Sequence, residues 1–440
     1  RRIAAAWALA GAAVLLAGCS VLGVRAESDA FYASTVLVGR IEAPPGTAGP
    51  LRVAAFPHGA AGGAPAHEVM LHEPGGFELI VPAGRYRLLA YADLNGNRRH
   101  DAGEPSGSRG ASEPIVADGT GVVVNLDIAL AVADGGTSLD AHVAAARRST
   151  QAGAIATPAD LAGDEAFSAA AGERGFWTPM QAFREQGGNV WFLESYDPKR
   201  IPVLFVHGAV GSVQDWRPFL AQLDRTRYQA WFFQYPSGAS VGSMAYLLYW
   251  KLFNLQLRHR FEHLAIVAHS MGGLVVRSFL VDHGAQFPQV RLFVSLSTPW
   301  GGEPAADLGV RHSPGVVPSW RDMQPEGAFM RTLFARPLPP QVRHVLVFGH
   351  RGGYSLFRPN TDGTVTLASQ LRGDAQAGAQ RVYGFDEDHT SILQSAAVWR
   401  TVQGVLDSLA SGDAGAPGGA GAGRVQVALR VADAVPRAPL

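Results

Sequence analysis

The chain of 440 residues is too long for one hydrophobic core of average size, so its length predicts two to three domains. Hydrophobic residues make up 47% and charged residues 17%, a balance that excludes a disordered chain and is typical of a globular protein. Lys and Arg together count 37, as do Asp and Glu, so no excess of charge favours nucleic acid and no nucleic-acid partner is expected.

Residues 1–19 have the layout of a signal peptide. Two arginines precede an apolar stretch over residues 3–16, and Cys19 is the single cysteine of the chain. One cysteine excludes an intramolecular disulfide and a thiolate-based structural zinc site. Leu16-Ala17-Gly18-Cys19 resembles the lipobox of bacterial lipoproteins, which implies cleavage before Cys19, acylation of its thiol and a membrane anchor. By the same resemblance, Ser20 implies the outer membrane of a Gram-negative cell envelope. An ordinary cleaved signal or a short membrane helix is the alternative.

Residues 31–131 carry short apolar runs separated by Gly, Pro and Asn, a pattern typical of strands joined by tight turns. The clearest runs lie at residues 35–39, 77–81, 86–91 and 121–128. We expect a small all-β sandwich domain here. Residues 132–175 are rich in Ala, Gly, Ser and Thr and predict a linker that contains a short helix at most.

One loop of this sandwich has a spacing that suits a metal ion. Oxygen-bearing side chains occupy its first, third, fifth, ninth and twelfth positions: Asp93, Asn95, Asn97, Asp101 and Glu104. This spacing wraps calcium, and the loop resembles those of extracellular β-sandwich modules, so we predict a structural calcium ion and no cofactor for catalysis. The glycine stands at the fourth position instead of the sixth, and nearby basic residues lower the expected affinity. A calcium-free Asn-Gly hairpin turn is the alternative.

From residue 176 to 410, strand-like apolar runs alternate with amphipathic segments, which predicts an α/β domain around a mostly parallel sheet. The expected strands are residues 203–206, 230–233, 264–267, 292–296 and 345–348. The aromatic run 246–253 is too short to span a bilayer and predicts a helix that faces the core or lines a pocket. Residues 411–440 form a Gly- and Ala-rich tail, in which residues 424–431 could add a strand without an assigned place.

The strongest motif is Ala268-His269-Ser270-Met271-Gly272, between the strand at 264–267 and a helix-like stretch. A sharp turn from strand to helix brings backbone segments so close that small residues are needed two positions before and after the central serine. Ala268 and Gly272 meet this need. The segment resembles the nucleophile elbow of bacterial lipases in the α/β-hydrolase superfamily. This resemblance implies an α/β-hydrolase fold with Ser270 as the catalytic nucleophile.

An oxyanion-binding loop is expected after the strand at 203–206. His207-Gly208-Ala209 at that point resembles the oxyanion loop of lipases and esterases, which implies that the backbone N–H groups of Ala209 and Met271 bind the oxyanion. Two fixed donors aimed at that oxygen lower the barrier of acyl transfer by several kcal/mol. The simpler interpretation is that His207-Gly208 only ends a strand.

A catalytic serine needs a histidine as base and a carboxylate that orients it. In the family that the elbow resembles, the chain order is serine, acid, histidine. The turn at residues 360–365 resembles the one that supplies the acid, which implies Asp362, and the position before a helix-like run implies His389 as the base. Asp322 and His350 are the competing candidates. We expect His269 to point away from the serine hydroxyl and to pack, and the His-x-x-Glu-His pattern at residues 259–263 to bind no metal.

Residues 297–302 resemble a segment that follows a core strand in lipases and in inositol deacylases, with Trp300 in place of the usual histidine. The apolar insertion at residues 301–341 predicts either a lid over an acyl site or further core. We therefore expect a lipid-anchored envelope enzyme that cleaves carboxylic esters of lipids. The alternatives are an acyltransferase or an amide or polyester hydrolase that uses the same serine, and a non-catalytic adhesion or scaffold lipoprotein.

Overall fold

The computed structural model describes residues 22–47, 49–59, 64–132, 151–352, 360–410 and 427–428. The chain forms two compact units. Unit 1 comprises residues 1–195, 233–260 and 308–321, and unit 2 comprises residues 196–232, 261–307 and 322–440. Cys19 and most of the tail 411–440 lie outside the described residues, so the predictions made for them are not addressed by the structure.

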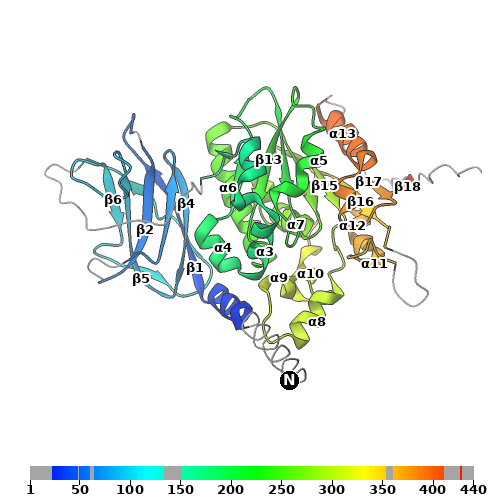
Figure 1. The fold of residues 1–440 in the computed structure, drawn as a ribbon, viewed down its shortest axis with the longest axis horizontal. Helices are drawn as coiled ribbons and strands as arrows, with labels where there is room; N and C mark the ends of the chain where they lie inside the picture. The colour runs from blue at the N-terminus through cyan, green and yellow to red at the C-terminus, as the bar shows by residue number, and fades with distance from the viewer. Residues whose placement is uncertain are drawn as a thin grey trace, which may run out of the picture. The chain divides into compact units, whose positions relative to one another are not determined.

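The N-terminal part of unit 1 is a small all-β module of two sheets, as expected (Figure 1). One sheet has the order β4-β1-β8, with β9 also paired to β1, and the other has the order β3-β2-β5-β6, with β7 paired to β5. The inward side chains of both sheets form one hydrophobic core, which includes Leu37, Phe77 and Leu88. The strands are β1 (Ser34–Glu42), β2 (Leu51–Pro57), β3 (His67–Leu71), β4 (Gly75–Pro82), β5 (Gly84–Ala92), β6 (Ser106–Arg109), β7 (Ile115–Ala117), β8 (Val122–Val123) and β9 (Ile128–Ala129).

The prediction of a single strand at residues 121–128 is wrong. Two short strands, β8 and β9, flank Asn125, and each pairs in parallel with β1. Asn125 has φ 62°, in the left-handed region that interrupts an extended chain. The apolar run therefore pairs with β1 in two separate short strands instead of one continuous strand.

Residues 133–150 of the predicted linker lie outside the described residues, whereas residues 151–192 are more ordered than a linker. After residue 150 the chain forms β10 (Ala154–Ile155), α2 (Pro158–Gly163), η1 (Glu165–Phe167), α3 (Ala169–Trp177), α4 (Pro179–Gln186) and β11 (Asn189–Phe192), and β10 pairs in parallel with β11. A capping box of Thr157 and Asp160 begins α2. The carboxylate of Glu27, in the helix at residues 22–32, accepts hydrogen bonds from the N–H groups of Met180 and Gln181 and so caps α4.

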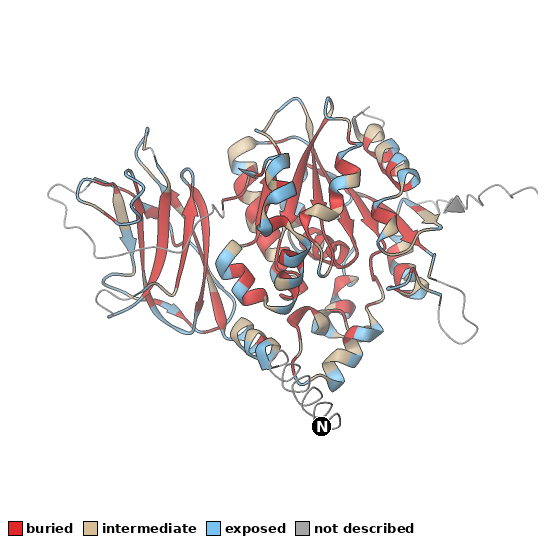
Figure 2. Cartoon of the chain, viewed as in Figure 1, coloured by how far each residue is buried: buried red, intermediate tan, exposed pale blue. Residues whose placement is uncertain are grey.

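Unit 2 contains a parallel sheet with strands in the order β13-β12-β14-β15-β16-β17-β18 (Figure 1). All five predicted strands are present, as β12 (Ile201–Val206), β13 (Tyr228–Gln234, which ends in unit 1), β14 (Leu264–His269), β15 (Val290–Leu296) and β16 (Arg343–Gly349). The chain adds β17 (Arg381–Phe385), which the sequence analysis missed, and β18 (Val427–Ala428), which pairs with β17 and gives the run at 424–431 a place. Every residue of β14 is buried, as Figure 2 shows for the sheet generally. The α/β class is therefore confirmed.

Helices and short 3-10 turns connect these strands. They are η2 (Val213–Trp216), α5 (Arg217–Leu220), α7 (Met271–His283), η3 (Gly284–Gln286), α10 (Ala328–Leu333), α11 (Leu367–Gln370), α12 (Gly373–Ala377), η4 (Ser391–Leu393) and α13 (Ala396–Ala410); α8 (Pro304–His312) and α9 (Pro318–Asp322) cross the boundary with unit 1. Met323 and Met330, both in the insertion at 301–341, are buried and so belong to the core.

The aromatic run 246–253 lies in α6 (Val241–His259) of unit 1. Its residues Tyr246, Leu247 and Trp250 line a cavity, in agreement with one of the two roles expected for this helix. Among the described residues, no helix is both long enough and apolar enough to cross a membrane.

Candidate active site

Ser270 lies at a sharp turn between β14 and α7. Its backbone has φ 52° and ψ −131°, a strained conformation for a residue with a side chain. Crowding explains the small neighbours, since a Cβ on Gly272 would lie 2.4 Å from the carbonyl oxygen of His207, and one on Gly208 would lie 2.7 Å from Cβ of Ser270. The N–H of Ser270 donates to the carbonyl of Leu296 at 2.8 Å, which ties the turn to β15.

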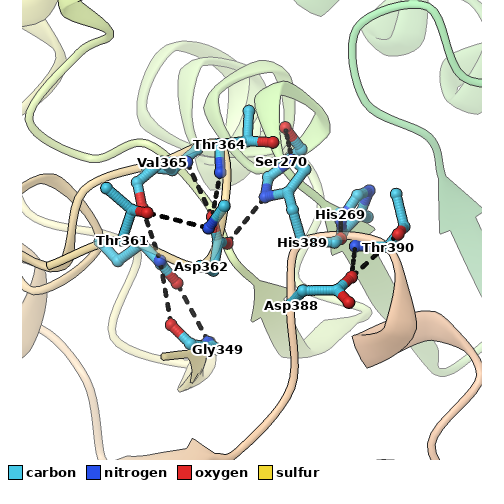
Figure 3. A network of polar contacts seen from close by, with 12 residues as sticks. His269, Ser270, Gly349, Thr361, Asp362, Thr364, Val365, Asp388, His389 and Thr390 are labelled. Atoms are coloured by element: carbon cyan, nitrogen blue, oxygen red, sulfur yellow. Dashed lines mark hydrogen bonds and ion pairs between the residues drawn. The ribbon is translucent and has the colours of Figure 1, made fainter. Parts of the chain in front are cut away.

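Three sequence-predicted residues meet at this turn (Figure 3). Nε2 of His389 lies 3.0 Å from Oγ of Ser270, and Nδ1 of His389 lies 2.7 Å from Oδ2 of Asp362. The side chain of His389 is 12% exposed and that of Asp362 is fully buried, so the imidazole lies between the hydroxyl of Ser270 and a carboxylate shielded from water. This is the geometry in which a histidine takes a proton from a serine while an acid fixes its tautomer.

Hydrogen bonds hold both the carboxylate and the main chain of Asp362 in place. Oδ1 accepts from the N–H groups of Thr364 and Val365 at 3.0 and 2.7 Å, Oδ2 faces His389, and the main-chain carbonyl accepts from the N–H of His389 at 2.7 Å. Burial alone would raise the pKa of Asp362, but the hydrogen bond and charge of His389 and the two amides outweigh burial and leave the pKa below its usual value. Asp362 is therefore held as a carboxylate.

The loop after β12 lies against the serine. Gly208 packs directly against Ser270, and Ala209, whose N–H is a predicted oxyanion donor, is the next residue of this loop. Met271 is the first residue of α7, so its N–H has no partner within the helix and lies at the positive end of the helix dipole. Nδ1 of His207 lies 2.9 Å from the carbonyl oxygen of Gly208 and helps to fix this loop. Burial lowers the pKa of His207 to about 4, so its imidazole is neutral near pH 7.

His269 does more than pack. Its side chain points away from the hydroxyl of its neighbour Ser270, and its Nε2 lies 2.8 Å from the carbonyl oxygen of His389, with the two imidazole rings 4.8 Å apart. Burial, followed by the neighbouring His389, lowers the pKa of His269 to about 3. A neutral imidazole can donate only through one nitrogen, so the contact assigns the proton to Nε2 of His269. His269 thereby supports the loop that carries the candidate base.

The segment after β15, which contains Thr298 and Trp300, packs against the first turn of α7 beside the elbow. A Cβ on Gly273 would lie 2.1 Å from Oγ1 of Thr298, so this glycine in α7 permits the close approach of the segment. Trp300 is 1% exposed and packs against Phe293, His344 and Phe334. Trp300 is therefore a core residue.

The acid in contact with His389 is Asp362, and the competing Asp322 is the last residue of α9. His350 is exposed, and its ring packs on Phe348. The pattern at residues 259–263 does not form one helical face, because α6 ends at His259 and Arg260 has a left-handed φ of 49°.

The loop predicted to bind calcium is closed by its own hydrogen bonds. Nδ2 atoms of Asn95 and Asn97 each lie 2.6 Å from Oδ2 of Asp101, and both carboxylate oxygens of Glu104 accept backbone N–H groups. Oδ2 of Asp93 pairs with Arg52 at 2.7 Å, whereas its buried Oδ1 has no hydrogen-bond partner within the described residues. Among those residues, no cluster of three or more His, Cys, Asp or Glu side chains is arranged to hold a metal. Calcium binding stays a prediction.

The strand order of unit 2, with Ser270 after β14, Asp362 after β16 and His389 after β17, defines an α/β-hydrolase fold. Residues 247–309, which include β14 and the elbow, match the family model of lecithin:cholesterol acyltransferase. No curated protein matches the chain.

Several solved structures are similar in part. The mature form of a lipase from Bacillus licheniformis is 21% identical with a TM-score of 0.40, over 48% of this chain and 94% of the lipase. The phospholipase PlaB from Legionella pneumophila is 16% identical with a TM-score of 0.32, over 39% of this chain and 44% of PlaB. A membrane phospholipase A, described as a bacterial virulence factor, is 17% identical with a TM-score of 0.34, over 51% of this chain and 84% of that protein.

Proposed function

We propose that the chain is a serine hydrolase that cleaves carboxylic esters, with acyl esters of lipids as the substrate class. The observation that carries this proposal is the pair of contacts that His389 makes, 3.0 Å to the hydroxyl of Ser270 and 2.7 Å to the carboxylate of Asp362. The match to the lecithin:cholesterol acyltransferase family model supports the acyl-ester class.

In the proposed reaction, Oγ of Ser270 attacks the ester carbonyl carbon while Nε2 of His389 takes the hydroxyl proton. The negative charge that forms on the carbonyl oxygen is bound by the N–H groups of Ala209 and Met271. When the bond to the leaving alcohol breaks, the imidazolium returns its proton to that oxygen. The products of this half-reaction are the free alcohol and an ester between the acyl group and Ser270.

The acyl group then passes to a second nucleophile. A water molecule gives up a proton to His389 and attacks the acyl carbon, and the return of that proton to Oγ of Ser270 releases the acid. Asp362 stays ionised throughout and stabilises the imidazolium. If an alcohol replaces water, the same steps give a new ester, and the family match makes this acyltransferase the second candidate.

The test is labelling with a fluorophosphonate probe, followed by assays on p-nitrophenyl esters of increasing chain length. We expect labelling and turnover in the wild type and neither in Ser270→Ala. Ser278→Ala is the matched control, because Ser278 is a buried serine in α7, the helix that follows Ser270, and its hydroxyl contacts Asp282. This variant should behave as the wild type. Full turnover by Ser270→Ala would refute the proposal.

Further arms of this test separate the alternatives. Adding a long-chain alcohol and measuring the new ester by mass spectrometry distinguishes transfer from hydrolysis, and anilide and polyester substrates test the amide and polyester alternatives. A folded wild-type protein that takes no label would instead support the non-catalytic adhesion or scaffold role.

Attachment to the membrane through an acylated Cys19, in the outer membrane of a Gram-negative cell envelope, is a second proposal, which is supported by the lipobox-like segment. Mass spectrometry of the mature N-terminus tests it: we expect acylated Cys19 as the first residue, and an unmodified terminus at another position would refute it.

Calcium at the loop of residues 93–104 is a third proposal, supported by the spacing of its oxygen-bearing side chains and by the unpartnered Oδ1 of Asp93. Calorimetric titration of the full chain with calcium tests it. We expect binding that is lost in Asp101→Ala, and the absence of binding to the wild type would refute the proposal.

A further inference from the structure

Unit 1 contains a cavity of about 470 Å³ that is lined by side chains of β1, β4, α4 and α6. Protein interiors are packed so closely that voids larger than a water molecule are few. This volume lies instead in the range of roughly 300–1,000 Å³ that is usual for ligand sites. Most of the lining is apolar, and six of these apolar side chains are buried: Val38, Ile80, Met180, Phe183, Met244 and Leu247.

The lining offers no free charge to a ligand. Among the described residues that line the cavity, Glu78 alone carries a charge. Its side chain is 2% exposed and forms an ion pair with Lys251, and the side chain of Trp250 also acts on it through a hydrogen bond. An anionic group would therefore lose its water in this cavity without meeting a cation among these lining residues. An uncharged apolar ligand avoids this cost.

The cavity opens to solvent beside the N-terminal helix at residues 22–32. Phe31 and Tyr32, the last two residues of this helix, line the cavity, and Tyr32 is 47% exposed. Thr120, Val122 and Ser243 are further lining residues that are exposed. The opening therefore presents hydroxyl groups beside apolar side chains, which suits a ligand whose one polar end carries a hydroxyl group.

The position of this opening favours a lipid as the occupant. The described chain begins with Leu22 at the start of the same helix, and Cys19 lies three residues before it, a reach of at most about 10 Å. The helix itself is about 16 Å long. The proposed acylation of Cys19 would thus hold the opening within roughly 30 Å of a bilayer, where lipid chains are the most abundant apolar ligands.

We propose that this cavity binds the hydrocarbon chain of a single-chain lipid with an uncharged, hydroxyl-bearing end. An apolar cavity of roughly 150 Å³ is large enough to bind benzene, so a volume three times larger accommodates on the order of 10–18 carbons. The chain lies among the buried apolar side chains, and the hydroxyl end lies at the opening. No residue of the candidate triad lines the cavity, so binding does not depend on the proposed hydrolysis, and only the source of the lipid rests on the proposed membrane anchor.

Gly242 offers a way to block the cavity selectively. It lines the cavity in the first turn of α6, and a Cβ added there would meet no atom within 4 Å. A leucine side chain would therefore fill part of the cavity, and leucine favours a helix more than glycine does. Gly242→Ala adds only one methyl group and is the control at the same position. Gly404 in α13 of unit 2 also has open space around it, so Gly404→Leu adds the same side chain away from the cavity.

The experiment is calorimetric titration of the full chain and these variants with decanol. We expect decanol to bind the wild type, with affinity at least tenfold weaker in Gly242→Leu and less than threefold weaker in Gly242→Ala and Gly404→Leu. Thermal unfolding of each variant verifies the fold, and the midpoint of Gly242→Leu should be equal to or above that of the wild type. Hydrolysis of p-nitrophenyl butyrate should be the same in all four proteins, and a protein without this activity could still bind decanol.

Two further ligands test the parts of the proposed lipid. Hexanol has four fewer methylene groups and should bind about a hundredfold more weakly than decanol. Decanoate at pH 8 has the same number of carbons with a charged end and should bind at least tenfold more weakly than decanol.

Three results would overturn parts of this proposal. Absence of decanol binding, or unchanged decanol affinity in a folded Gly242→Leu, would overturn the site, even if decanol bound elsewhere on the protein. Equal affinity for hexanol and decanol would overturn the burial of a long chain. Equal affinity for decanoate and decanol would overturn the assignment of an uncharged end.

Discussion

Replacement of Asp362 by asparagine gives the most direct test of the candidate base. Oδ1 of Asp362 accepts two backbone N–H groups, so an asparagine must keep its carbonyl oxygen there and turn its NH₂ group toward Nδ1 of His389. The imidazole can then only accept at Nδ1 and must carry its proton on Nε2, which faces the hydroxyl of Ser270. A protonated Nε2 cannot take the serine proton.

The expected loss follows from this wrong tautomer. In a Ser-His-Asp triad, the same substitution lowers kcat by about 10⁴-fold, which corresponds to about 5.5 kcal/mol of activation free energy. We expect a loss of this order for Asp362→Asn, with KM nearly unchanged and the fold retained, because the new side chain has the same shape.

The assay is steady-state hydrolysis of p-nitrophenyl butyrate, together with thermal unfolding of each variant. Asp388→Asn is the matched control, since Asp388 stands next to His389 in sequence but accepts hydrogen bonds from the N–H groups of Thr390 and Ser391 instead of contacting the imidazole. It should lose less than tenfold. A folded Asp362→Asn enzyme within tenfold of the wild type would refute the reasoning.

Three further outcomes are expected. His269→Phe removes the contact to the carbonyl of His389 and should lower kcat about tenfold to a hundredfold with little change in KM; an unchanged kcat in steady-state kinetics would contradict the positioning role. Lys251→Met leaves the Glu78 carboxylate buried without its cationic partner and should lower the free energy of unfolding in urea by about 3–5 kcal/mol. The double variant with Glu78→Met should recover most of this loss. Equal stability of the wild type and Lys251→Met would contradict the prediction. Burial lowers the pKa of His207 to about 4 and those of His269 and His344 to about 3, so protonation of these histidines favours the unfolded state. The free energy of unfolding should therefore fall by about 1.4 kcal/mol per pH unit per histidine as the pH drops from 6.5 towards 4. Equal urea midpoints at pH 7.5 and pH 5 would argue against this prediction.

Strands at the centre of the sheet could be predicted because both of their faces are buried. The runs that became β12, β14 and β15 are almost continuously apolar, so their identity does not depend on which face is inward. β17, with the sequence Arg-Val-Tyr-Gly-Phe, begins with an exposed arginine and contains a glycine, so local hydrophobicity does not identify it. Its place is set by pairing with β16, which is information held far away in the chain.

The same distinction applies to the site. The elbow could be recognised because its requirement for small residues is local, and the turn around Asp362 has its own short pattern. The contact of His269 with the carbonyl of His389 joins residues 120 positions apart, and the pair of Glu78 with Lys251 joins residues 173 positions apart. Unlike Ser270 and His389, which are also 119 positions apart, these pairs have no recognisable motif at either end, so only the folded chain reveals them.

The N–H of His389 donates to the carbonyl of Asp362 in addition to the bond between their side chains. Because two hydrogen bonds join the acid and the base, a displacement of one residue moves the other with it. The loops before Asp362 and after His389 can therefore differ in length without separating these two residues. Adaptation to a bulkier substrate would have to come from the residues around Asp362 and His389, because the distance between these two is fixed by their hydrogen bonds.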